Sequence, residues 1–149
     1  MTSKTPNREI LPDNVVPLHY DLTVEPELKI NNPAIDTVTL NTVDTDIHSA
    51  KIGDVTSSEI ISEEEQQVTT FAFPKGTMSS FKGNAFLDIK FTGILNDNMA
   101  GFYRAKYEDK LTGETKYMAT TQMEPTDARR AFPCFDEPNL KASFAITLV

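Results

Sequence analysis

Apolar and polar residues alternate with a period of two along most of the chain, which is the pattern of half-buried β-strands. The first clear stretch, HYDLTV at 19–24, follows Pro12 and Pro17 and is expected to stop at Pro26. Residues 142–149 alternate in the same way and predict a final strand. Between them, turn signals recur roughly every 8 to 15 residues. They separate further predicted strands, at 28–30, 37–40, 47–52, 68–73, 85–91, 101–107 and 116–121.

Two segments predict other local structure. The stretch YEDKLTGETKY at 107–117 places Thr112 and Gly113 between two tyrosine-ended arms. It predicts a hairpin with a positive-φ residue at its tip, because that conformation matches the right-handed twist of the flanking strands. A single short helical turn is predicted at 126–131, and the Phe-Pro pair that follows halts it.

Many short strands with little helix predict an all-β fold, with a saddle-like or sandwich arrangement of antiparallel or mixed sheets. At 149 residues the chain is long enough for one hydrophobic core. We expect residues 1–10 to form a flexible N-terminus and residues 11–149 to form one β domain. The acidic run EEEQQ at 63–67 is interpreted as a solvated loop.

Composition and charge exclude several classes of function. The net charge is −8 and the pI is near 4.7, whereas surfaces that bind nucleic acid are basic. An acidic surface mainly confers solubility, but it also draws cationic peptides, and composition does not separate the two. Residues 1–10 lack the apolar core of a secretory signal, and no run approaches the ~18 apolar residues of a membrane span. With Cys134 as the single cysteine, we expect a cytoplasmic protein without internal disulfides that binds neither nucleic acid nor membrane.

The residues that hydrolytic chemistry requires are mostly missing. His19 and His48 are the two histidines, and no H-E-x-x-H helix brings two imidazoles onto one face. Cys134 lies between Pro133 and Phe135, an apolar setting that favours a packed and inert thiol. Neither a G-x-S-x-G elbow nor a glycine-rich phosphate loop occurs. By its residues alone, the chain has no complete catalytic apparatus and binds no metal.

The last part of the chain carries a long and unusual string. Residues 116–148, KYMATTQMEPTDARRAFPCFDEPNLKASFAITL, closely resemble the signature of the N-terminal domain of M1 family zinc aminopeptidases, notably the puromycin-sensitive-like and fungal alanine/arginine enzymes. LPDNVVPLHYDLTVEP at 11–26 resembles the opening strand of that domain, and MAGFYRAKYEDKLTG at 99–113 resembles the strand and hairpin before the signature. The resemblance implies a saddle-like β domain that covers one side of a zinc catalytic domain and grips the free amino end of a peptide.

By this resemblance, Glu124 in the TQMEP string matches the acidic residue that binds the α-ammonium group of the substrate. Gln122 matches the residue that lines the first side-chain pocket. A carboxylate in a narrow, partly dry cleft attracts an ammonium group much more strongly than it does in water. The alternative is that Glu124 is a surface acid before a proline and that Gln122 is an ordinary strand residue.

The other charged residues of the signature carry both signs at short range, so we expect them to satisfy one another and to hold the loop that carries Glu124. They are Asp127, Arg129, Arg130, Asp136, Glu137 and Lys141, with Phe132, Phe135 and Phe144 as apolar anchors.

The chain departs from the family pattern at two places. After Pro26 the family continues into another strand, often with an F-x-G-x-V pattern, and about a dozen residues are expected to be missing here. Such a loss exposes the hydrogen-bonding edge of a neighbouring strand. The chain also stops at Val149, before the G-A-M-E-N loop and the H-E-x-x-H zinc helix of the family.

These features lead to one principal hypothesis about function. The chain is expected to be the amino-end-binding part of a zinc aminopeptidase, inactive by itself, with zinc bound elsewhere in the parent enzyme. Its partners would be a peptide N-terminus, held through Glu124, and the catalytic domain, in cis or in trans. The alternative is a non-catalytic β-sandwich that binds a partner protein. In either case we expect marginal stability and a tendency to associate.

Overall fold

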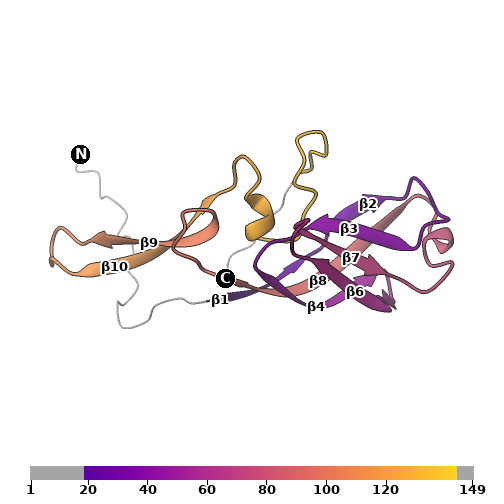
Figure 1. The fold of residues 1–149 in the computed structure, drawn as a ribbon, viewed down its shortest axis with the longest axis horizontal. Helices are drawn as coiled ribbons and strands as arrows, with labels where there is room; N and C mark the ends of the chain where they lie inside the picture. Colours follow the sequence, from indigo (N-terminus) through magenta and orange to yellow (C-terminus); the bar gives the residue numbers. More distant parts are fainter. Residues whose placement is uncertain (1–18, 144–149) are drawn as a thin grey trace, which may run out of the picture.

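The structure, a computed structural model, describes residues 19–143 and is built from antiparallel sheets (Figure 1). In the largest sheet, β8 (Asn84–Ile94) is the central strand. One edge of β8 pairs with β1 (His19–Val24) and then with β2 (Glu27–Lys29). The other edge pairs with β4 (Thr45–Ile52), which pairs in turn with β5 (Val55–Thr56).

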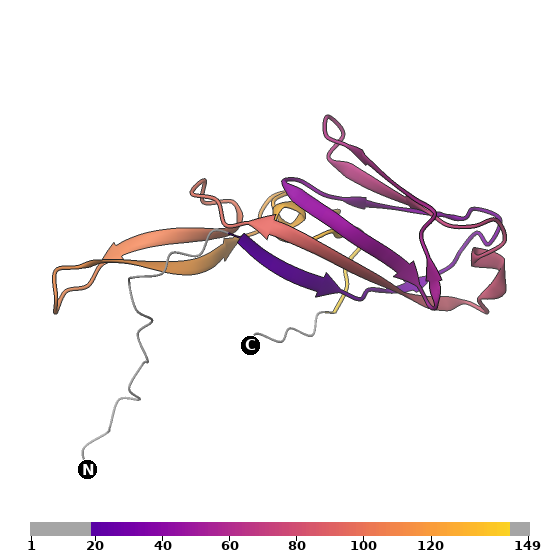
Figure 2. The same cartoon turned by 90° about the horizontal axis from the view of Figure 1, so that it is seen from below.

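The second sheet has three strands, with β7 (Val68–Ala72) between β3 (Thr37–Asn41) and β6 (Glu59–Glu63). The third is a hairpin of β9 (Gly101–Glu108) and β10 (Thr115–Gln122). Figure 2 shows that this hairpin extends away from the two larger sheets, which face each other. The hairpin therefore stands outside the main core.

The hydrophobic core lies between the two larger sheets. Its buried side chains come from strands of both, since the period-2 alternation of each strand turns one set of side chains inward. They are Leu40 from β3, Phe71 from β7, Ala50 and Ile52 from β4, and Ala85, Leu87 and Ile89 from β8, with Phe73 and Met78 beside them. Met78 lies in a short 3-10 helix, η1 (Met78–Ser80).

The predicted all-β fold is confirmed, and most predicted strands are found within a few residues of their expected bounds. The helical turn predicted at 126–131 is the 3-10 helix η2 (Ala128–Arg130). Gly113 at the hairpin tip has φ +72°, as the turn requires. Two strands were missed: β5, which has only two residues, and β6, whose sequence EIISE does not alternate clearly. The strand predicted at 142–149 lies mostly outside the described residues.

The first strand ends at Val24, before Pro26, as predicted, but the next strand continues along the same partner. Val24 is opposite Ile89 and Glu27 is opposite Phe86, so β1 and β2 share one register along β8 and only Pro26 and its neighbour interrupt the strand. The N–H of Leu87 donates to the carbonyl of Pro26 at 3.0 Å. The return bond to the Leu87 carbonyl cannot form, because proline has no N–H.

We expect Pro26→Val to raise the free energy of unfolding by about 1 kcal/mol, measured by urea denaturation at low protein concentration. The new N–H supplies the missing ladder bond, and this gain exceeds the smaller entropic benefit of proline in the unfolded chain. Thr23→Val is the matched control, because the backbone of Thr23 faces away from β8, and it should change stability by only a few tenths of a kcal/mol. Equal effects of the two substitutions would contradict this explanation.

Candidate functional site

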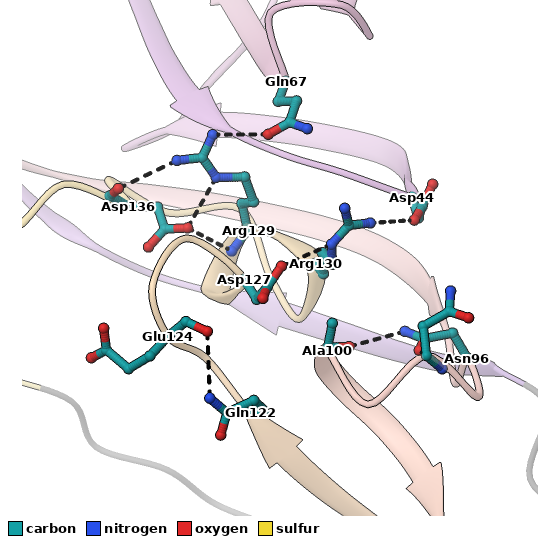
Figure 3. Close-up of polar contacts among 11 residues, drawn as sticks. Asp44, Gln67, Asn96, Ala100, Gln122, Glu124, Asp127, Arg129, Arg130 and Asp136 are labelled. Atoms are coloured by element: carbon teal, nitrogen blue, oxygen red, sulfur yellow. Dashed lines mark hydrogen bonds and ion pairs between the residues drawn. The ribbon is translucent and has the colours of Figure 1, made fainter.

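Glu124 lies in the turn that connects the hairpin to η2 (Figure 3). The turn is closed by the N–H of Asp127, which donates to the carbonyl of Met123 at 2.9 Å. The Gln122 side-chain amide donates to the backbone carbonyl of Glu124 at 3.4 Å, and the peptide bond between Glu124 and Pro125 is cis. The Glu124 side chain is exposed, and its carboxylate points away from the nearby arginines.

Arg129 fastens the segment that follows this turn to the second sheet. Its Nε donates to Asp136 Oδ2 at 3.0 Å, and its terminal nitrogen donates to Gln67 Oε1 at 3.1 Å. Its backbone carbonyl accepts a hydrogen bond from the N–H of Val43 at 2.9 Å. The side chains of Arg129 and Asp136 are each only 12% exposed, so this ion pair is shielded from solvent on both sides.

Arg130 makes a second set of contacts, toward the hairpin and the first sheet. Its Nε pairs with Asp127 Oδ1 at 3.0 Å, and a terminal nitrogen pairs with Asp44 Oδ2 at 2.9 Å. Gly101, the first residue of β9, packs directly against it. A Cβ at Gly101 would lie 2.5 Å from the Arg130 Cβ, and the φ of +72° also favours glycine there. Arg130 thus ties the base of the hairpin to the start of β4.

Backbone pairing completes the attachment. Asn41 and Cys134 form an antiparallel bridge, with N–H···O distances of 2.8 and 3.2 Å, and the side-chain carbonyl of Asn41 accepts from the N–H of Asp136 at 3.1 Å. Burial raises the pKa of the Cys134 thiol to about 12, and the nearby Asp136 carboxylate adds to the rise. The thiol is therefore protonated at neutral pH, in agreement with its predicted inert role.

The expectation that the signature charges satisfy one another is confirmed for Asp127, Asp136 and the two arginines. It is wrong for Glu137 and Lys141, which are exposed and form no ion pair within residues 19–143. Phe144 lies outside the described residues. The sequence did not reveal the partners of the signature in other strands and turns, because nothing in their local pattern marks them. These partners are Asn41, Asp44, Gln67 and Gly101.

A groove of about 490 Å³ lies away from Glu124. Its lining residues include Asp44, Asp46 and Glu63 but neither Gln122 nor Glu124. The Glu124 side chain is exposed and does not line this groove.

No metal site is visible in residues 19–143, where no three His, Cys, Asp or Glu side chains are grouped to hold an ion. The exposed His48 is hydrogen-bonded through Nε2 to Thr92 Oγ1 at 2.5 Å. The side chain of His19 is not among those described. Over the same residues, no helix is long and apolar enough to span a bilayer.

The fold is all-β, and ion pairs and hydrogen bonds hold the 123–136 segment of the signature against it. One class of protein combines these features. The sequence pattern of the peptidase M1 N-terminal domain matches residues 16–149. The chain therefore belongs to the family of peptidase M1 N-terminal domains.

Similar proteins are aminopeptidases. The chain is 90% identical to "Aminopeptidase 2, mitochondrial" of Saccharomyces cerevisiae over all of its length, which covers 17% of that protein. It is 58% identical over 96% of its length to the "Alanine/arginine aminopeptidase" of the same yeast and covers 18% of it. "Aminopeptidase N" of Rattus norvegicus is 35% identical over 99% of the chain, which covers 18% of the rat protein. The chain thus spans less than a fifth of the length of these relatives.

The alignment with the first of these relatives also shows a difference. It extends over 162 positions, whereas this chain has 149 residues, so thirteen positions of the yeast protein have no counterpart here. This number is close to the dozen residues that the family pattern leads one to expect after Pro26.

We expect Asp136→Ala to lower the free energy of unfolding by about 2 to 4 kcal/mol, because it leaves the shielded Arg129 guanidinium without its carboxylate. Glu137→Ala is the matched control, since this neighbouring acid is exposed, and it should have an effect within about 0.5 kcal/mol. Thermal denaturation of both variants measures the difference. Similar melting temperatures would show that the ion pair does not hold the segment.

We expect the Cys134 thiol of the folded chain to react with iodoacetamide at pH 8 at least about a hundredfold more slowly than in denaturant, where its pKa returns to about 8.5. The thiolate is the reactive form, and the raised pKa removes nearly all of it. Mass spectrometry of timed samples gives both rates. Comparable rates in the folded and unfolded chain would contradict the buried, protonated state.

Proposed function

We propose that this domain holds the free amino end of a peptide in a zinc aminopeptidase, through the carboxylate of Glu124. The family and the aminopeptidase relatives support the general assignment. The observation that carries the specific role is the construction of the Glu124 turn. A dense set of ion pairs and backbone bonds fixes the segment on one side of it, and the hairpin fixes it on the other.

On this proposal, most residues of the signature have a structural role, which is to hold the turn that carries Glu124. A recognition carboxylate contributes most when its position is set before the ligand arrives, since the ligand then does not bear the cost of ordering it. The neighbouring acids Asp127 and Asp136 are occupied by arginines. No ion pair joins Glu124 to another residue in the described range, so its charge remains available for a ligand.

A single fixed carboxylate also explains exopeptidase action. Only a peptide whose terminal ammonium reaches Glu124 would place its first amide bond at a fixed distance from that residue, where the catalytic groups would act. The amide of Gln122 lies beside Glu124 and would line the pocket for the first side chain. A peptide with a blocked amino end would lose the ion pair and bind poorly.

The catalytic groups would come from the remainder of the enzyme. The described residues do not fit a zinc site, because no three metal-ligating side chains are grouped there. Zinc would therefore be bound by a catalytic domain that packs beside this one, in cis or in trans. That domain would also supply a wall opposite the exposed Glu124 side chain, so that a cleft forms around it. A cytoplasmic location is part of the proposal and is supported by the single, reduced Cys134.

We expect Glu124→Gln to lower kcat/KM for free peptides by about a hundredfold, the usual cost of removing one partner of a desolvated ion pair. The test uses a chimera in which this chain replaces the matching part of the 90% identical yeast aminopeptidase. The same substitution in the intact yeast enzyme provides a second measurement if the chimera is inactive.

Two controls sharpen this test. Glu137→Gln removes an exposed acid of the same segment and should leave kcat/KM within about twofold. N-acetylated peptides should be poor substrates of the parent enzyme, and Glu124→Gln should remove most of its preference for the free amino end. An unchanged preference in that variant would refute the role of Glu124. The isolated chain should show no turnover with or without added zinc.

A further inference from the structure

The outer edge of the first sheet presents an open β-strand. β1 and β2 form this edge, and within residues 19–143 no strand pairs with their outer side. Within that range, the outer hydrogen-bonding groups of this edge are therefore available to a further strand.

Along this edge, the N–H and C=O groups of successive residues point alternately toward β8 and away from it. Ile30 donates its N–H to the Gly83 carbonyl at 2.7 Å, and the Pro26 carbonyl accepts from Leu87, so both residues face β8. In an antiparallel ladder, residues two apart face the same side and their immediate neighbours face the other. Glu25, Glu27 and Lys29 therefore turn their N–H and C=O groups away from β8.

Proline does not protect this edge. A proline on an edge strand normally blocks pairing when its nitrogen faces solvent. The Pro26 nitrogen instead faces Leu87, so the ring interrupts the inner ladder and leaves the outer groups intact. The side chains on the core side of the strand, Val24, Leu28 and Ile30, are only partly buried. An added strand would cover them further.

We propose that a second copy of this chain pairs with this edge, antiparallel and about a two-fold axis at Leu28. This register places Glu27 of each copy opposite Lys29 of the other, so two opposite-charge pairs form, and Glu25 is opposite the neutral Asn31. The two Leu28 side chains meet on the apolar face. Neighbouring registers are less favourable. An axis at Glu27 also pairs Glu25 with Lys29 twice, but it sets the two Glu27 carboxylates opposite each other. An axis at Pro26 places Glu25 opposite Glu27 twice.

The pairing is isologous, because each residue contact is repeated by symmetry. Glu27 and Lys29 lie on the exposed side of the strand, and Asn84 Nδ2 already orients the Glu27 carboxylate through a 2.9 Å hydrogen bond. The proposal rests on this edge alone and does not depend on the role of Glu124.

Sedimentation velocity and amide hydrogen exchange over a wide range of concentrations test this pairing. We expect a monomer–dimer equilibrium in which protection of the Glu27 and Lys29 amides rises as the dimer forms. Protection that is already complete in the monomer would mean that another segment of the same chain covers the edge, and would overturn the proposal. A dimer in which these amides stay unprotected would place the interface elsewhere and would also overturn it.

Charge variants test the register. Lys29→Glu sets like charges opposite each other twice and should weaken the dimer by about tenfold or more. The double variant Glu27→Lys with Lys29→Glu reverses both pairs and should restore most of the affinity, although it also loses the Asn84 contact. Glu25→Lys changes the net charge as much as Glu27→Lys does but faces Asn31, so it should have little effect. Failure of the double variant to recover, or equal effects of the two single glutamate variants, would refute this register.

Discussion

Backbone pairing along both edges of β8 is the interaction on which the rest of the structure depends. This strand of eleven residues pairs with β1 and β2 on one side and with β4 on the other. Its inward residues Leu87, Ile89 and Phe91 are almost fully buried. Since a strand presents alternate side chains to its two faces, this one segment fixes both the order of the first sheet and the layer that the second sheet covers.

The candidate site lies outside that core and is held by a different kind of interaction. The hairpin contributes few buried side chains, and two paired strands alone are marginally stable in water. Its attachment depends on the signature segment, where Arg129 reaches the second sheet and Arg130 reaches the first. Ion pairs are more directional than apolar packing, because a guanidinium group and a carboxylate fit each other in few orientations. The position of Glu124 follows from these contacts.

The same chain combines a well-packed scaffold with two exposed features. The Glu124 side chain is exposed, and within residues 19–143 no strand pairs with the outer edge of β1 and β2. The proposed role of Glu124 and the proposed pairing of the edge are compatible, because they use different parts of the molecule.

The sequence by itself determined most of the strands, the hairpin turn and the family, because period-2 alternation, glycine at a positive-φ tip and a long signature string are local features. It also indicated that Arg129, Arg130, Asp127 and Asp136 neutralise one another. Only the tertiary structure showed that Asn41, Asp44 and Gln67 receive this segment, that Gly101 makes room for Arg130, and that Pro26 faces inward on a continuous edge. These facts depend on which strands become neighbours. Packing between residues far apart in the chain determines which strands pair, and the local sequence pattern does not contain this information.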